Sequence, residues 1–107
     1  MHRFHIKKIL LTILLSLPTS VSAEITKAQE LAICTEAAFF LKTTDLEDYN
    51  SKLRVEVLAQ FPKDRFEFMY GWHMGWATAF TSGIAARTAD DVDAVRLHNL
   101  KECRVDL

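Results

Sequence analysis

A histidine between two methionines has the most obvious chemical potential in this sequence. His73 stands in the stretch FMYGWHMGWATAF, residues 68–80, with Met69 one helical turn before it and Met74 beside it. Histidine and methionine together can hold copper or a haem iron. The pattern is not specific, because the chain has no CxxCH motif and its next histidine, His98, lies on another predicted helix. A metal or haem carrier is therefore a minor hypothesis, and we expect no metal and no cofactor.

A second role for His73 is the sensing of acid. A histidine on an apolar helix face is normally hydrogen-bonded within a core. Protonation would place a charge in that core and loosen the fold or a dimer. This interpretation makes His73 a pH sensor and the protein an acid-responsive periplasmic chaperone or sensor.

The acidic residues form two clusters, which raises the question of acid–base chemistry or a calcium site. The first cluster holds Asp45, Glu47 and Asp48, and the second holds Asp90, Asp91 and Asp93. Both lie where helices are expected to begin, and acids at a helix start complement the helix dipole. The second cluster lacks the glycine and the distal glutamate of an EF-hand loop. We therefore interpret both clusters as helix-start signals.

The sequence shows no arrangement of residues that would activate a catalytic nucleophile. Ser82 precedes Gly83 but lacks the GxSxG frame. His73 lies nine residues away, on the opposite side of the same predicted helix. There is no phosphate-cradling glycine loop either. The sequence therefore predicts that the protein is not an enzyme.

The first 23 residues have the layout of a secretory signal peptide. Positive residues within positions 3–8 precede an apolar block over residues 9–17, and residues 21–23, Val-Ser-Ala, are small as the peptidase requires. The apolar block is about half as long as a membrane-spanning helix. We therefore expect cleavage after Ala23, export to the periplasm or out of the cell, and a soluble single helical domain over residues 24–107.

The net charge of the chain argues against nucleic acid or an anionic membrane as a partner. The leader holds three of the 13 Lys and Arg residues and no acid, which leaves 10 basic against 14 acidic side chains in residues 24–107. A net charge of about −4 without a basic run lacks the electrostatic footprint for nucleic acid or an anionic membrane. We expect neither partner, and no membrane span after signal cleavage.

The two cysteines, Cys34 and Cys103, are expected to form a structural disulfide. They stand near opposite ends of the predicted mature chain, and an even pair in a short exported domain favours a disulfide. A metal site or a reactive thiol is less favoured, because neither a CxxC spacing nor an adjacent histidine is present. Closing a loop of this length stabilises a fold by roughly 4 kcal/mol.

Helix signals dominate residues 24–107. Capping boxes begin at Thr26 and at Thr44, apolar residues recur behind them at helical spacing, and Pro62 separates a second helix from a third. The first predicted helix spans about residues 27–42, the second runs from the Thr44 box to about residue 60, and the third spans about 62–86. Thr88 is expected to open a fourth helix, which carries Cys103. The expected fold class is all-α: a small four-helix domain with a central aromatic and glycine-containing helix and one disulfide joining helix 1 to helix 4.

The predicted central helix, about residues 62–86, has two faces when it is drawn at 100° per residue. Bulky side chains such as Phe66 and His73 share one face, and Gly71, Gly75 and Ala79 lie on the other. A helix that is apolar nearly all round is normally buried. We expect the bulky face to fill the core and the small residues to pack against a second helix, either within the chain or in a homodimer.

A second interpretation leaves part of this helix exposed as a protein-binding surface. A short domain has limited area with which to cover its aromatic side chains, and such side chains are enriched where partners dock. The candidate partner-binding residues are Phe68, Tyr70, Trp72, Met74 and Trp76. The sequence does not identify the partner protein.

In size, export signal and single disulfide, the chain is similar in outline to small helical periplasmic proteins such as acid-activated chaperones and immunity proteins against secreted toxins. The sequence thus predicts an exported, non-enzymatic helical protein that binds another protein, as an inhibitor, an immunity-type protein or another interaction module.

Overall fold

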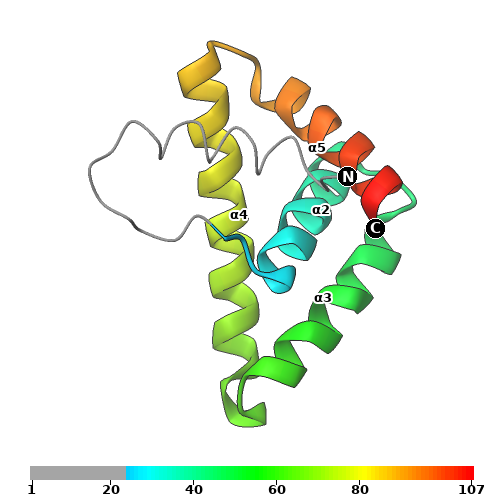
Figure 1. Ribbon diagram of the computed structural model, residues 1–107, viewed down its shortest axis with the longest axis vertical. Helices are drawn as coiled ribbons and strands as arrows, with labels where there is room; N and C mark the ends of the chain where they lie inside the picture. The colour runs from blue at the N-terminus through cyan, green and yellow to red at the C-terminus, as the bar shows by residue number, and fades with distance from the viewer. Residues whose placement is uncertain (1–23) are drawn as a thin grey trace.

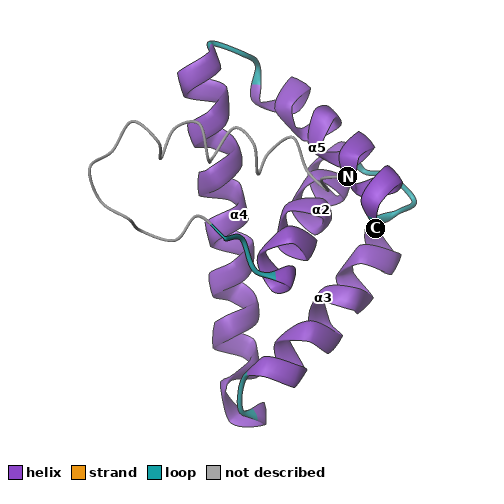
Figure 2. Cartoon of the chain, viewed as in Figure 1, coloured by secondary structure: helices purple, strands orange, loops and turns teal. Residues whose placement is uncertain are grey.

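The computed structural model describes residues 24–107, so the predicted signal peptide lies outside the described residues. Four α-helices joined by short loops make up the described chain (Figure 2). They are α2 (Lys27–Leu41), α3 (Leu46–Gln60), α4 (Phe66–Thr88) and α5 (Val92–Asp106), and a 3-10 turn, η1 (Lys63–Arg65), leads into α4. Residues 24–107 contain no strand. The all-α prediction is confirmed.

The first helix begins at the predicted capping box. The hydroxyl of Thr26 accepts a hydrogen bond from the Gln29 backbone N–H at 3.0 Å, and the Gln29 side chain accepts one from the Thr26 N–H at 2.9 Å. These two bonds satisfy backbone donors that a helix start leaves without partners. This local signal was therefore sufficient to locate the start of α2.

The second predicted capping box, at Thr44, does not form. The N-cap of α3 is Asp45, which makes no capping hydrogen bond with its side chain. Its carboxylate instead accepts a hydrogen bond from Nε of Arg104 on α5 at 2.7 Å. That hydrogen bond holds the pKa of the Asp45 carboxyl below its ordinary value. The Asp45 side chain thus makes a tertiary contact and does not cap α3.

The start of α5 also differs from the prediction. Thr88 ends α4, and its hydroxyl donates a hydrogen bond to the carbonyl oxygen of Ile84 at 2.8 Å. The N-cap of α5 is Asp91, whose carboxylate accepts from the Asp93 backbone N–H at 3.0 Å. Thr88 therefore closes one helix rather than opening the next, because its hydroxyl is satisfied within its own helix.

The helix at the centre of the fold is α2, not the aromatic helix. Every residue from Glu30 to Ala38 is buried, and α2 packs against α3, α4 and α5. Figure 1 shows α4 along one edge of the molecule, with the other three helices on the same side of it. Small residues such as Ala32 and Ala37 allow helices to approach α2 from several directions. The prediction of a central aromatic helix is therefore corrected.

The predicted disulfide is confirmed. Cys34 of α2 and Cys103 of α5 are fully buried and bonded to each other, with their Cα atoms 5.9 Å apart. The bond thus joins the first and last described helices through the core.

Of the helices within residues 24–107, none is both long and apolar enough to cross a membrane.

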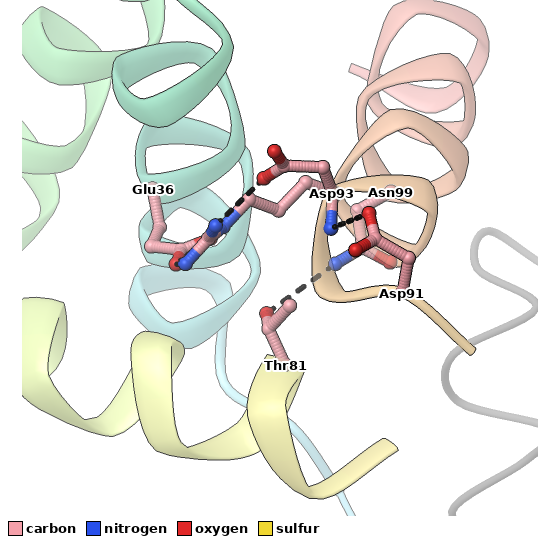
Figure 3. Close-up of polar contacts among 6 residues, drawn as sticks. Glu36, Thr81, Asp91, Asp93 and Asn99 are labelled. Atoms are coloured by element: carbon pink, nitrogen blue, oxygen red, sulfur yellow. Dashed lines mark hydrogen bonds and ion pairs between the residues drawn. The ribbon is translucent and has the colours of Figure 1, made fainter. Parts of the chain in front are cut away.

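Polar side chains link α5 to α2 and α4 inside the fold (Figure 3). Glu36 points from α2 toward α5, where its carboxylate accepts a hydrogen bond from Nε of Arg96 at 3.0 Å and lies 2.9 Å from Nη2 in an ion pair. Asn99 points from α5 to Thr81 of α4, with 3.4 Å between its amide nitrogen and the hydroxyl. These contacts hold α5 against α2 and α4, in addition to the disulfide that joins α5 to α2.

Candidate functional site

The aromatic helix α4 has one buried side and one open side. Phe66, His73, Ala77 and Ile84 lie on its buried side and belong to the packed interior. The opposite side is exposed along most of the helix. We call this opposite side the outer face of α4, formed by Phe68, Gly71, Trp72, Gly75, Ala79, Ser82 and Ala86.

The outer face carries no charged residue. Between Glu67 and Arg87, α4 contains no Asp, Glu, Lys or Arg. A surface helix normally turns charged residues to solvent, opposite its apolar stripe. Here α4 lies at the edge of the molecule, and none of the other three helices covers its outer face (Figure 1). An exposed apolar surface of this kind is typical of an interaction site.

Two aromatic side chains project from this face. Phe68 is 65% exposed and Trp72 is 45% exposed. Trp76, one turn further along, is half-buried and stacks on Phe80, with their ring centroids 5.0 Å apart. Each step of four residues turns the side chain by about 40° around the helix, so this row passes from solvent toward the core. Phe68 and Trp72 are therefore the residues best placed to contact a partner.

The other two candidate binding residues lie on a different side of α4. The hydroxyl of Tyr70 donates a hydrogen bond to the side-chain carbonyl of Asn50 on α3. Burial raises the pKa of Tyr70 above its ordinary value. Met74 and Tyr70 also line an open cavity of about 400 Å³, together with Phe39 and Leu46. The five predicted residues thus do not form one surface.

Gly71 and Gly75 contact nothing on their open side. A methyl group added at either glycine would have no atom within 4 Å, apart from the backbone of its own helix. Of the two packings expected for this small face, within the chain or in a homodimer, the one within the chain does not occur at Gly71 and Gly75 in residues 24–107, where Ala79 is exposed as well. The reason is that α2 takes the central position, so α4 is covered on one side only.

We expect Gly75→Ala to raise the free energy of unfolding by about 1 kcal/mol in dilute solution, because alanine is the better helix former and the added methyl has space. The matched control is Ala79→Gly, exposed on the same face, which should lower it by a similar amount. Urea unfolding followed by circular dichroism measures both. A loss of stability in Gly75→Ala would show that another part of the chain approaches the glycine.

His73 is a core residue. Its side chain is 3% exposed, and its Nδ1 lies 2.7 Å from the carbonyl oxygen of Met69, to which it donates a hydrogen bond. Its ring contacts Trp72 and Phe61, with centroid distances of 4.9 and 6.0 Å. Across the described part of the chain, no group of three or more His, Cys, Asp and Glu residues could hold a metal ion. Acid sensing by His73 stays a prediction.

The acidic clusters have structural partners. Asp45 contacts Arg104, Asp91 caps α5, and the carboxylate of Asp93 lies 2.9 Å from Nη1 of Arg96. These contacts are consistent with carboxylates at helix starts, although the partners come from tertiary structure as well as from the helix dipole.

Arg87 is the residue of this region that the sequence did not reveal. Its guanidinium lies back over Gly83, where a methyl group would be 3.5 Å from Nη1. Arg87 makes no ion pair with any residue in the range 24–107. The sequence feature that could have identified Arg87 is its position directly after 19 residues without a charged side chain.

In comparison with known proteins, the chain matches no protein-family model, no curated protein and no solved structure at a significant level. Its function has to be inferred from the chemistry of its own surface.

Proposed function

We propose that the protein is an exported, non-enzymatic helical protein that binds another protein through the outer face of α4. The observation that carries this proposal is the exposure of Phe68 and Trp72 on a helix face without charge. Aromatic side chains in such positions are the usual anchors of protein interfaces.

The small residues beside the two aromatic side chains support this role. Gly75 and Ala79 project little from the helix, so a partner backbone can come close beside Trp72. Complete burial of a side chain such as Phe68 contributes roughly 1.5–3 kcal/mol. In protein interfaces a few such anchors carry most of the binding energy, and the residues around them exclude water.

The remainder of the fold acts as a rigid support for this surface. A buried disulfide joins α2 to α5. Disulfides of this kind persist in oxidising compartments, which is consistent with export. Binding residues on a regular helix keep a fixed spacing, and a fixed spacing lowers the entropy lost on binding. These features fit an inhibitor, an immunity-type protein or another small interaction module.

We expect the double substitution Phe68→Ala/Trp72→Ala to weaken binding of the partner at least 30-fold, since loss of an interface anchor costs about 2 kcal/mol or more. The partner is first captured from an extract of the producing cells and identified, and its dissociation constant is then measured with purified components. The control is Val105→Ala on α5, which is 78% exposed and does not belong to the outer face of α4. Equal affinities of the double variant and the wild type would contradict the proposal.

A further inference from the structure

The outer face of α4 is nearly self-complementary about its midpoint, which lies at the level of the buried residue Ala77 along the helix. Phe68 lies nine residues before Ala77, and Ala86 lies nine residues after it. At 1.5 Å per residue, the two positions are each about 13 Å from the midpoint. Eighteen residues are five full turns, so Phe68 and Ala86 also point in the same direction. A large side chain at one end therefore corresponds to a small one at the other.

The same relation holds for Trp72. Five residues separate it from Ala77, and Gly83 lies six residues beyond the midpoint. Trp72 and Gly83 are eleven residues apart, which places them about 20° from each other around the helix. The second bulky side chain thus also corresponds to a position without a side chain.

We propose that a second copy of this chain occupies the outer face of α4, with the two α4 helices antiparallel about a twofold axis that crosses this face between Gly75 and Ala79, at the level of Ala77 along the helix. In this arrangement Phe68 lies over Ala86 of the partner subunit, and Trp72 lies over Gly83 of the partner subunit. The inference rests on the proposed function, because it assigns an occupant to the same surface. Its twofold symmetry closes the assembly at a dimer.

Charge gives an independent argument for the antiparallel direction. The guanidinium of Arg87 lies over Gly83 and has no ion-pair partner among residues 24–107. In the antiparallel dimer it meets the ring of Trp72 from the other copy, which is a favourable cation–π arrangement. A parallel dimer would place Phe68 against Phe68 and Arg87 against Arg87, so bulky residues would collide and like charges would meet. The antiparallel direction is therefore favoured.

The size of the face indicates a weak dimer. Nineteen residues of helix extend about 28 Å. One pair of helices of this length buries less than the roughly 1,600 Å² of a standard stable interface. We therefore expect association near a chain concentration of about 0.1 mM, weak enough for a tightly bound partner protein to replace the second copy.

The first test is the mass in solution of protein purified from cells that express the full chain, measured by sedimentation equilibrium over increasing concentration. We expect the mass to rise toward twice that of one chain, and both Trp72→Ala and Ala86→Phe to weaken association at least tenfold. Val105→Ala should leave it unchanged. A mass of one chain at all concentrations up to about 1 mM, ten times the expected midpoint, would overturn the inference.

The second test is the direction of the helices. Gly71 and Ser82 are exposed, lie six residues before and five residues after Ala77, and point about 20° apart. A mixture of Gly71→Cys and Ser82→Cys chains, oxidised gently, should give mixed disulfide-linked dimers in excess over like pairs. An excess of like pairs would overturn the antiparallel arrangement. Unchanged circular dichroism spectra check that both variants are folded.

These results separate the inference from the proposed function. If the wild type stays monomeric while Phe68→Ala/Trp72→Ala loses its partner protein, the dimer is wrong and the binding function stands. If the wild type dimerises while the double variant keeps its partner protein with unchanged affinity, the dimer stands and the partner protein does not bind through the outer face of α4.

Discussion

Replacing Arg96 with methionine is expected to lower the free energy of unfolding by about 3–5 kcal/mol, because the change leaves the Glu36 carboxylate buried without its cation. Glu36 is fully buried, and the Arg96 residue is 8% exposed. The guanidinium also lies 4.0 Å from the centroid of the Phe40 ring and 2.9 Å from the carboxylate of Asp93. Burial opposes the charge on Arg96, but the hydrogen bonds to Glu36 and Asp93 outweigh it, so its pKa is raised.

Two further variants test this explanation in the same urea titration. Glu36→Gln/Arg96→Met removes both charges together, so it should be clearly more stable than Arg96→Met alone. Arg104→Met removes the exposed partner of Asp45 and should change stability very little, since exposed ion pairs are screened by solvent. If Arg96→Met costs no more than Arg104→Met, the buried pair does not hold α5 on α2.

The ends of helices follow from local sequence where a nearby side chain satisfies the backbone. Thr26 and Gln29 cap each other within three residues. Phe61 is extended before Pro62, as the proline ring requires, and ends α3. Asp45 departs from this logic because its partner is Arg104, 59 residues away. A contact at that distance in sequence leaves no trace in the local pattern.

The central position of α2 depends on a distant residue in the same way. Glu30 and Glu36 give this helix a partly polar pattern, although both glutamates are buried. Burial of a carboxylate is costly unless it is paired. For Glu36 the cation is Arg96, 60 residues along the chain. The identity of the central helix could therefore not be predicted from periodicity alone.

For α4 the existence of a long apolar helix was predicted correctly, but its place in the fold was not. A helix apolar on all sides is normally buried on all sides, which favoured a central position. With α2 at the centre, α4 is covered on one side only, and Phe68 and Trp72 remain exposed. Their exposure is what makes the outer face a candidate site. Tyr70 and Met74 lie two residues after Phe68 and Trp72, so at 100° per residue they point to nearly the opposite side of the helix. There they line a cavity together with residues of α2 and α3.

Removing the disulfide is the second change with a large expected effect. Cys34 and Cys103 are 69 residues apart, and a cross-link of this length restricts the unfolded chain strongly. We expect equilibrium unfolding in reductant to show a free energy of unfolding lower by roughly 4 kcal/mol than that of the oxidised protein. A domain of this size has a total stability of about 5–15 kcal/mol, so the reduced protein should be marginal at 37 °C.

A comparison of two reduced states separates the cross-link from packing. Reduced wild type keeps both sulfur atoms in the core, whereas Cys34→Ala/Cys103→Ala also removes them from fully buried positions. The double variant should therefore be less stable than the reduced wild type by a further cavity term. A difference between oxidised and reduced wild type below about 1 kcal/mol would contradict the entropic explanation. It would mean that contacts such as Glu36–Arg96 hold α5 on α2 without help from the disulfide.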